Sequence, residues 1–123
     1  MTNVPSIRAL ELCIDVNDPV RESTFWCEFL GYRVVGGNDD RWVHMDPPSG
    51  LPVINLQRVP EPKVGKNRLH IDVYVDEPLA WIDRALSLGA SKVRLNDDQN
   101  DWFCVMNDPE DNEFCICLEN EPG

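Results

Sequence analysis

Two corresponding positions of an internal repeat hold the side chains best suited to chemistry. The segments Glu11–Pro19 and His70–Pro78 match at an offset of 59 positions, so Glu11 and His70 occupy equivalent places. A glutamate in a cleft must find a partner or raise its pKa, and such a glutamate is the usual form of a general base. His70 is a candidate partner. The alternative is a solvated glutamate at a strand edge and a histidine that only hydrogen-bonds across a sheet, for instance to Asp72 or Glu11.

Thiols and aromatic rings are the other candidates for chemistry. Cys115 and Cys117 are two positions apart, so in a strand they share one face. There they act as reactive groups or ligands, or they fill space as small buried apolar side chains. Trp42 and Trp102 repeat at an offset of 60, and they either stack a planar or cationic ligand or pack in the core or at its rim. For His44, packing at the rim is favoured over chemistry.

The elements that position these residues follow from apolar periodicity and from the residues that end helices. Residues 7–16 alternate between apolar and polar side chains, which predicts a strand. Asp18-Pro19 and Gly31 then frame a predicted helix over residues 20–30. Strands are expected at 32–35, 41–45 and 52–58, followed by a linker at 59–67. The pattern then restarts, with a strand at 68–75, a helix at 78–88 and strands at 92–95, 102–106 and 113–118. Each half is therefore predicted to be β-α-β-β-β.

Strand alternation divides each predicted sheet into an apolar face and a mixed face. The helix of each half is expected to cover the apolar face, which carries Leu12, Ile14 and Val16 in the first half. The opposite face combines aromatic, thiol and polar side chains, which suits a lined pocket, although a half-solvated sheet face is the alternative. Its predicted members are Glu11, Cys13, Asp15, Trp42, His44, Asn55, Gln57, His70, Asp72, Tyr74, Trp102, Cys104, Glu113, Cys115 and Cys117.

Composition limits the class of protein. A chain of 123 residues with 42% hydrophobic residues predicts a single globular domain over 1–123, with one module at about 7–58 and the other at about 68–118. Five cysteines without CxxC spacing, and no signal-peptide pattern, predict a cytoplasmic protein with free thiols. A net charge of −11 argues against nucleic acid and leaves a cationic ligand open, although acidity also serves solubility alone. No apolar run is long enough to suggest a membrane partner.

The doubled module resembles the vicinal oxygen chelate superfamily, which includes glyoxalase I, the extradiol dioxygenases, and the fosfomycin and bleomycin resistance proteins. Asp18-Pro19 and the aromatic residues of 25–32 look like the first helix of that family and the turn after it. Residues 59–72 look like the linker and second-module start of its glyoxalase-like branch, and residues 108–114 like its last hairpin. The resemblance implies an α+β fold of two βαβββ modules in tandem. Mixed curved sheets would form a cleft, with the helices on the outer face.

The resemblance also implies a ligand set. Metal-using members take one ligand from each first strand and one from each last strand, which correspond here to Glu11, Gln57, His70 and Cys115. They would hold one divalent ion (zinc, nickel, manganese or iron). Cys115 departs from the glutamate usual at its position, and a thiolate in the set favours zinc over a hard octahedral ion. The residues expected to contact a small-molecule ligand are Trp42, His44, Asn55, Asp72, Tyr74 and Trp102.

Three functions remain open, and the resemblance suggests the first two. One is a metal-dependent lyase or isomerase that acts on a small oxygenated substrate, with Glu11 as the catalytic residue that moves a proton. The other is a binding and sequestration protein of the bleomycin-resistance type, which holds a cationic small molecule without catalysis. A ligand-binding or regulatory domain is a third possibility. Members pair modules within a chain or between chains, and a homodimer is expected here.

Overall fold

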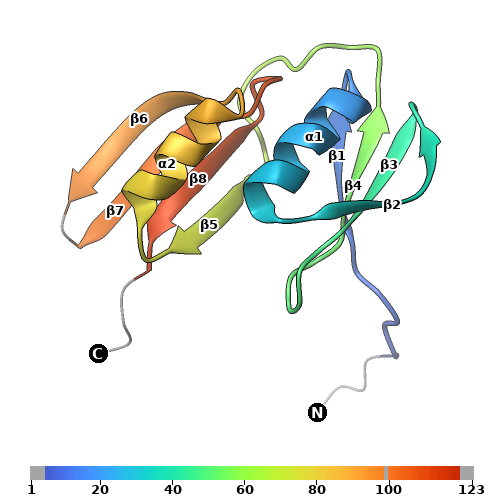
Figure 1. The fold of residues 1–123 in the computed structure, drawn as a ribbon, viewed down its shortest axis with the longest axis horizontal. Helices are drawn as coiled ribbons and strands as arrows, with labels where there is room; N and C mark the ends of the chain where they lie inside the picture. The colour runs from blue at the N-terminus through green and yellow to red at the C-terminus, as the bar shows by residue number, and fades with distance from the viewer. Residues whose placement is uncertain (1–4, 99, 120–123) are drawn as a thin grey trace.

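The computed structural model describes residues 5–98 and 100–119, and it contains two modules with the same order of elements. The first consists of β1 (Leu12–Val16), α1 (Pro19–Leu30), β2 (Arg33–Asp39), β3 (Trp42–Asp46) and β4 (Ile54–Arg58). The second consists of β5 (Ile71–Val75), α2 (Pro78–Ser87), β6 (Ser91–Asp98), β7 (Asp101–Asn107) and β8 (Glu113–Leu118). Figure 1 shows the modules side by side, with α1 and α2 each in front of the sheet of its own module. The predicted β-α-β-β-β order is confirmed in both halves.

Each module forms a mixed four-stranded sheet. The strand orders are β1-β4-β3-β2 and β5-β8-β7-β6, and in each sheet the first pair is parallel and the other pairs are antiparallel. β1 and β5 are edge strands, and they lie on the inner sides of the two modules in Figure 1. Within residues 5–98 and 100–119, no strand pairing joins one sheet to the other.

Local sequence signals begin and end α1. The Asp18 carboxylate accepts a hydrogen bond from the Arg21 backbone N–H at 3.1 Å, and Pro19 occupies the first turn, where its missing N–H costs little. Gly31 ends the helix at φ 78°, a left-handed conformation that glycine adopts without a Cβ clash. No helix in the described part of the chain is both long and apolar enough to cross a membrane.

The aromatic side chains of α1 build a core that both modules share. Phe25, Trp26 and Phe29 repeat at helical spacing and are buried. The Trp26 ring lies 5.1 Å from that of Phe114 on β8, and the Phe29 ring lies 5.4 Å from that of Trp81 on α2. Edge-to-face contacts at these distances add to the burial of apolar area. The helix of the first module is therefore packed against the second module as well as against its own sheet.

The turn between β7 and β8 holds the N-terminus of α1. The Glu110 carboxylate accepts hydrogen bonds from the backbone N–H groups of Asn17 (2.6 Å) and Asp18 (2.7 Å). The indole N–H of Trp26 donates to Asp108 Oδ2 at 3.2 Å. A carboxylate at this end also complements the positive end of the helix dipole. A turn of the second module thus fixes the helix of the first.

Candidate functional site

A cavity of about 490 Å³ lies on the face of the second sheet opposite α2. Alternation along β5 explains its position, because Ile71 and Val73 pack toward the core while Asp72 and Tyr74 point the other way. The lining combines charged, thiol and aromatic residues: Lys66, His70, Asp72, Tyr74, Arg94, Asp101, Phe103, Glu113, Cys115 and Cys117 are among them. Such a mixture is typical of a small-molecule site and unlike a plain solvated sheet face.

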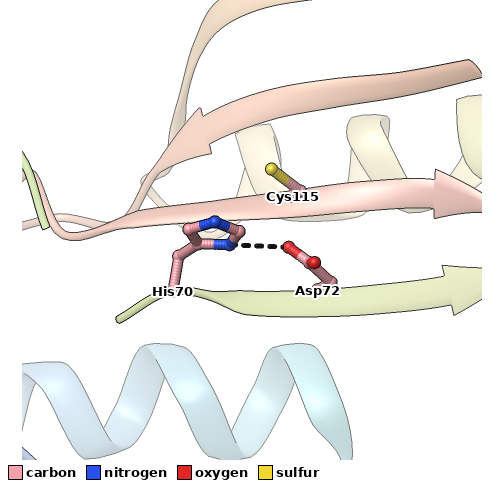
Figure 2. A group of neighbouring side chains, drawn as sticks. All are labelled: His70, Asp72 and Cys115. Carbon is pink, nitrogen blue, oxygen red and sulfur yellow. Dashed lines mark hydrogen bonds and ion pairs between the residues drawn. The ribbon is translucent and has the colours of Figure 1, made fainter. Parts of the chain in front are cut away.

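Three side chains in this cavity form a potential metal-ligand cluster. Donor atoms of His70, Asp72 and Cys115 all lie within 4.8 Å of one another. Figure 2 shows His70 and Asp72 at the start of β5 and Cys115 on the neighbouring strand β8. His70 Nδ1 lies 2.7 Å from Asp72 Oδ1, a hydrogen bond in which the ring N–H donates to the carboxylate. The structure therefore brings together the predicted residues His70 and Cys115, with Asp72 as the third donor.

Strand register produces this cluster. Asp72 on β5 is paired directly with Cys115 on β8, so their side chains emerge side by side on one face. His70 is two positions before Asp72 and thus shares its face. Asp72 was predicted to contact a small-molecule ligand but not to be a metal ligand. The His-x-Asp spacing was visible, whereas the pairing with Cys115 depends on the register.

The Cys115 thiol is strongly perturbed. Its pKa is raised to about 11, first by burial and then by the neighbouring Asp72 carboxylate, because a thiolate there would meet a second negative charge. The thiol is therefore protonated at neutral pH. A bound cation would reverse this effect, because a metal stabilises the thiolate that coordinates it.

The rest of the cavity wall contains both signs of charge. The guanidinium carbon of Arg94 lies 5.5 Å from the centre of the Phe103 ring, a cation–π distance. The Glu113 carboxylate accepts a hydrogen bond from the Asn67 backbone N–H at 2.9 Å, which lowers its pKa. Lys63 lies 3.5 Å from the same carboxylate. Glu113 is therefore already engaged by groups of the protein itself.

The first sheet carries its own pair of candidate residues. Asn55 is buried on β4, and its side-chain amide donates to Glu11 Oε1 at 2.7 Å. His44 Nε2 lies 3.1 Å from Asp46 Oδ1, and Trp42 is 43% exposed. Glu11 does not line the 490 Å³ cavity and is not in the described cluster of metal-binding side chains. Within one chain, Glu11 and His70 thus belong to separate sites.

The predicted equivalence of Gln57 and Cys115 is wrong. The parallel pairs match Leu12 with Ile54 in the first sheet and Ile71 with Phe114 in the second. Because Glu11 corresponds to His70, Asn55 corresponds to Cys115, and Gln57 corresponds instead to Cys117. The offset between β4 and β8 is therefore 60 and not 58. Comparison of residue types along the sequence did not reveal this difference.

Two residues predicted on the mixed face lie on the other face. Cys104 is completely buried beside Met106, and Trp102 packs against the same core while also bordering the cavity. The face of β7 toward the cavity carries Phe103 and Val105. The error came from aligning Trp102 with Trp42, whereas register matches Trp42 with Phe103. A role for Trp102 in ligand binding remains a prediction.

Arg94 reaches the cavity because of a β-bulge. Lys92 is paired with Met106 and Arg94 with Val105, so the strand shifts by one residue between them. A bulge of this kind changes the face to which later side chains point. Strict alternation would put Lys92 and Arg94 on one face, so the position of Arg94 at the cavity does not follow from the sequence pattern.

A family model described as "Glyoxalase-like domain" matches residues 11–117. The chain belongs to this glyoxalase-like family within the vicinal oxygen chelate superfamily, as its sheets and helices also indicate. No curated protein sequence gives a significant match.

Solved structures share the fold at low identity. A glyoxalase/bleomycin resistance protein/dioxygenase family enzyme from Burkholderia phytofirmans PsJN matches with a TM-score of 0.74 and 18% identity, over 88% of this chain and 95% of the other. The fosfomycin resistance protein FosX from Mesorhizobium loti matches with a TM-score of 0.72 and 15% identity, over 94% and 95%. Lactoylglutathione lyase from Agrobacterium tumefaciens matches with a TM-score of 0.66 and 19% identity, over 94% and 96%. These similarities establish the fold and leave the reaction open.

Proposed function

We propose that the protein is a metal-dependent lyase or isomerase that acts on a small oxygenated substrate in the cavity of the second sheet. The observation that supports this proposal is the cluster of His70, Asp72 and Cys115, whose donor atoms lie within 4.8 Å of one another in that cavity. A related fold is known to accommodate a metal, because a FosX structure from Listeria monocytogenes is described as a complex with Mn(II).

The chemistry of the donor set fits zinc better than manganese. Imidazole nitrogen, thiolate sulfur and carboxylate oxygen are the usual zinc ligands, whereas manganese prefers oxygen-rich sites. When bound, such an ion polarises a carbonyl or a pair of neighbouring oxygens on the substrate. His70, Asp72 and Cys115 would hold it, with Glu11 and Gln57 remaining candidate ligands from the sequence pattern.

The protein's own residues have separate tasks in this proposal. Asp72 orients the His70 ring through the 2.7 Å hydrogen bond, which fixes the tautomer of the free site. Tyr74 and Phe103 shape the cavity for a small ligand, and Trp42, His44, Asn55 and Trp102 are further candidates for ligand contact. Glu11 is the proposed proton-transfer residue, held at the first sheet by Asn55.

A homodimer is part of the proposal. β1 and β5 each have one edge without a strand partner in the described chain, and an unpaired strand edge is able to pair with a second copy. In such a dimer, Glu11 of one protomer can face the cavity of its partner. Glu11 and His70, the two equivalent positions that lie in separate sites within one chain, would then belong to one site.

A binding protein for a cationic small molecule is the second candidate. Tyr74 is 63% exposed at the cavity, and its pKa is raised by the nearby Cys117 and by the carboxylates of Asp72 and Asp101. A negative potential beside an exposed aromatic ring suits a cation. Metal dependence separates this candidate from the enzyme.

Thermal unfolding of metal-stripped protein with zinc, nickel, cobalt, manganese and ferrous iron tests the proposal. A ligand that binds only the folded state at one hundred times its dissociation constant stabilises it by about 2.7 kcal/mol. We expect zinc to raise the melting temperature of the wild type, and His70→Gln and Cys115→Ser to abolish the effect.

His44→Gln is the matched control. His44 is also bonded to an aspartate two residues later, but it is not part of the described metal-ligand cluster. It should keep the full zinc effect. An equal loss in His44→Gln, or no stabilisation of the wild type by any ion, contradicts the proposed metal centre.

A further inference from the structure

Arg94 is placed over the proposed ligand site by a specific structural feature. The β-bulge after Lys92 pairs Arg94 with Val105, whose side chain lines the cavity. Its guanidinium carbon is 5.5 Å from the centre of the Phe103 ring, also in the cavity. An arginine stacked on an aromatic ring has fewer conformations to lose when it binds a ligand.

The guanidinium has no ionic partner in the described structure. Among residues 5–98 and 100–119, no carboxylate lies within 4.0 Å of a side-chain nitrogen of Arg94 or of Lys66. The cavity also holds three carboxylates, those of Asp72, Asp101 and Glu113. Asp72 is bonded to His70 and Glu113 to Asn67, and Lys66 is among the charges that lower the pKa of Glu113. Arg94 is therefore a cation in the wall of the cavity that has no ion-pair partner within 4.0 Å among the described residues.

Strand register relates Arg94 to the metal-ligand cluster. Asp72 is paired with Cys115, Cys115 with Val105, and Val105 with Arg94, so the four residues form one row across the sheet. Two strand spacings separate Cys115 from Arg94, about 10 Å between backbones. The long side chain of Arg94 spans part of this distance. The space left between its guanidinium and Cys115 then has the size of a small organic molecule.

We propose that Arg94 is a specificity-determining residue that binds an oxyanion group of the substrate, with Lys66 adding positive charge at the same cavity. This inference rests on the proposed function, because it takes the cavity as the ligand site. The substrate class is a small molecule with oxygen donors at one end and a carboxylate or phosphonate at the other. The planar guanidinium matches either group through two parallel hydrogen bonds.

Nuclear magnetic resonance titrations of the full chain test this inference with three probes. Glutarate supplies a carboxylate, methylphosphonate supplies a phosphonate, and choline supplies a cation. We expect the wild type to bind one or both oxyanions at millimolar concentration, with shifts at β6 and β7. Arg94→Gln should weaken that binding about tenfold or more, the scale of one charge-assisted hydrogen bond.

Lys92→Gln is the matched control, since it removes one positive charge from the same strand on the other side of the bulge. It should bind the oxyanions as the wild type does. The comparison of glutarate with methylphosphonate identifies the preferred oxyanion.

Several outcomes overturn the inference. They are equal affinities of Arg94→Gln and Lys92→Gln, binding of choline without binding of either oxyanion, and no oxyanion binding to the wild type. Zinc stabilisation measured on the same variants keeps this result separate from the metal proposal, because Arg94→Gln should retain the zinc effect. A wild type that binds oxyanions but no metal refutes only the metal centre.

Discussion

Glu22 provides a quantitative test of the core between the two modules. Its side chain on α1 is 0% exposed, and neither carboxyl oxygen has a hydrogen-bond partner among the described residues. Burial raises its pKa from 4.5 to about 10, with Asp108 and then Glu110 adding negative charge nearby. The folded protein therefore holds Glu22 in its neutral, protonated form.

The sign of the pH effect follows from linkage. The folded state keeps the Glu22 proton up to about pH 10, whereas the unfolded chain releases it near 4.5. The contribution of protonated Glu22 to the stability of the folded state is complete below the unfolded-state pKa. It is lost as the pH rises from that value toward about 10. Each pH unit inside the window costs about 1.4 kcal/mol, so the step from about pH 5.5 to about pH 7.5 costs about 2.7 kcal/mol.

Glu22→Gln is the variant that isolates the contribution of Glu22 ionisation to the free energy of unfolding. Glutamine keeps the shape of the side chain but cannot ionise, so we expect its free energy of unfolding to lose this component of the pH dependence. Urea denaturation at a series of pH values measures the difference. Relative to the wild type, Glu22→Gln should gain about 2.7 kcal/mol between about pH 5.5 and about pH 7.5.

Glu28→Gln is the control, because Glu28 is exposed on the same helix. Its pH profile should follow that of the wild type. If the profiles of Glu22→Gln and the wild type are parallel over the same pH range, Glu22 is ionised in the folded protein and the argument from burial is refuted.

Four further predictions concern other parts of the molecule. Glu110→Gln weakens the charged contact of the β7–β8 turn with the N-terminus of α1, and urea denaturation should show a loss of about 1 kcal/mol. Gly31→Ala forces a side chain into a left-handed conformation at φ 78° and should cost about 1–2 kcal/mol in the same assay. Because its pKa is about 11, Cys115 should react with iodoacetamide slowly at neutral pH and faster as the pH rises toward that value, as site-resolved mass spectrometry can measure. Asp72→Asn should increase that rate at a given pH, since it removes one of the charges that disfavour the thiolate.

The fold was largely predictable from the sequence because its signals are local. Asp18-Pro19 and Gly31 mark the ends of α1, and alternation in 12–16 and 71–75 identifies the strands β1 and β5. Each signal depends on a few neighbouring residues and needs no knowledge of the distant chain. The same locality explains why strand ends differ by only a few residues from expectation.

The candidate site was less predictable because it depends on pairing between strands. His70 and Cys115 were predicted from the repeat and the family resemblance, but Asp72 became a third donor only through its register with Cys115. Arg94 depends on a bulge that the composition of β6 does not reveal. A single-residue shift moves every later side chain to the other face, so small errors in alignment become large errors in a site.

The contact of Glu110 with the start of α1 has a consequence for the biosynthesis of the protein. A nascent chain is made from its N-terminus, so α1 leaves the ribosome well before Glu110 and Phe114 exist. Until then, the aromatic side chains of α1 are not packed against the second module. N-terminal units commonly fold first during translation. Here the first module must wait for the last hairpin of the second, so its final packing is delayed until that hairpin has been synthesised.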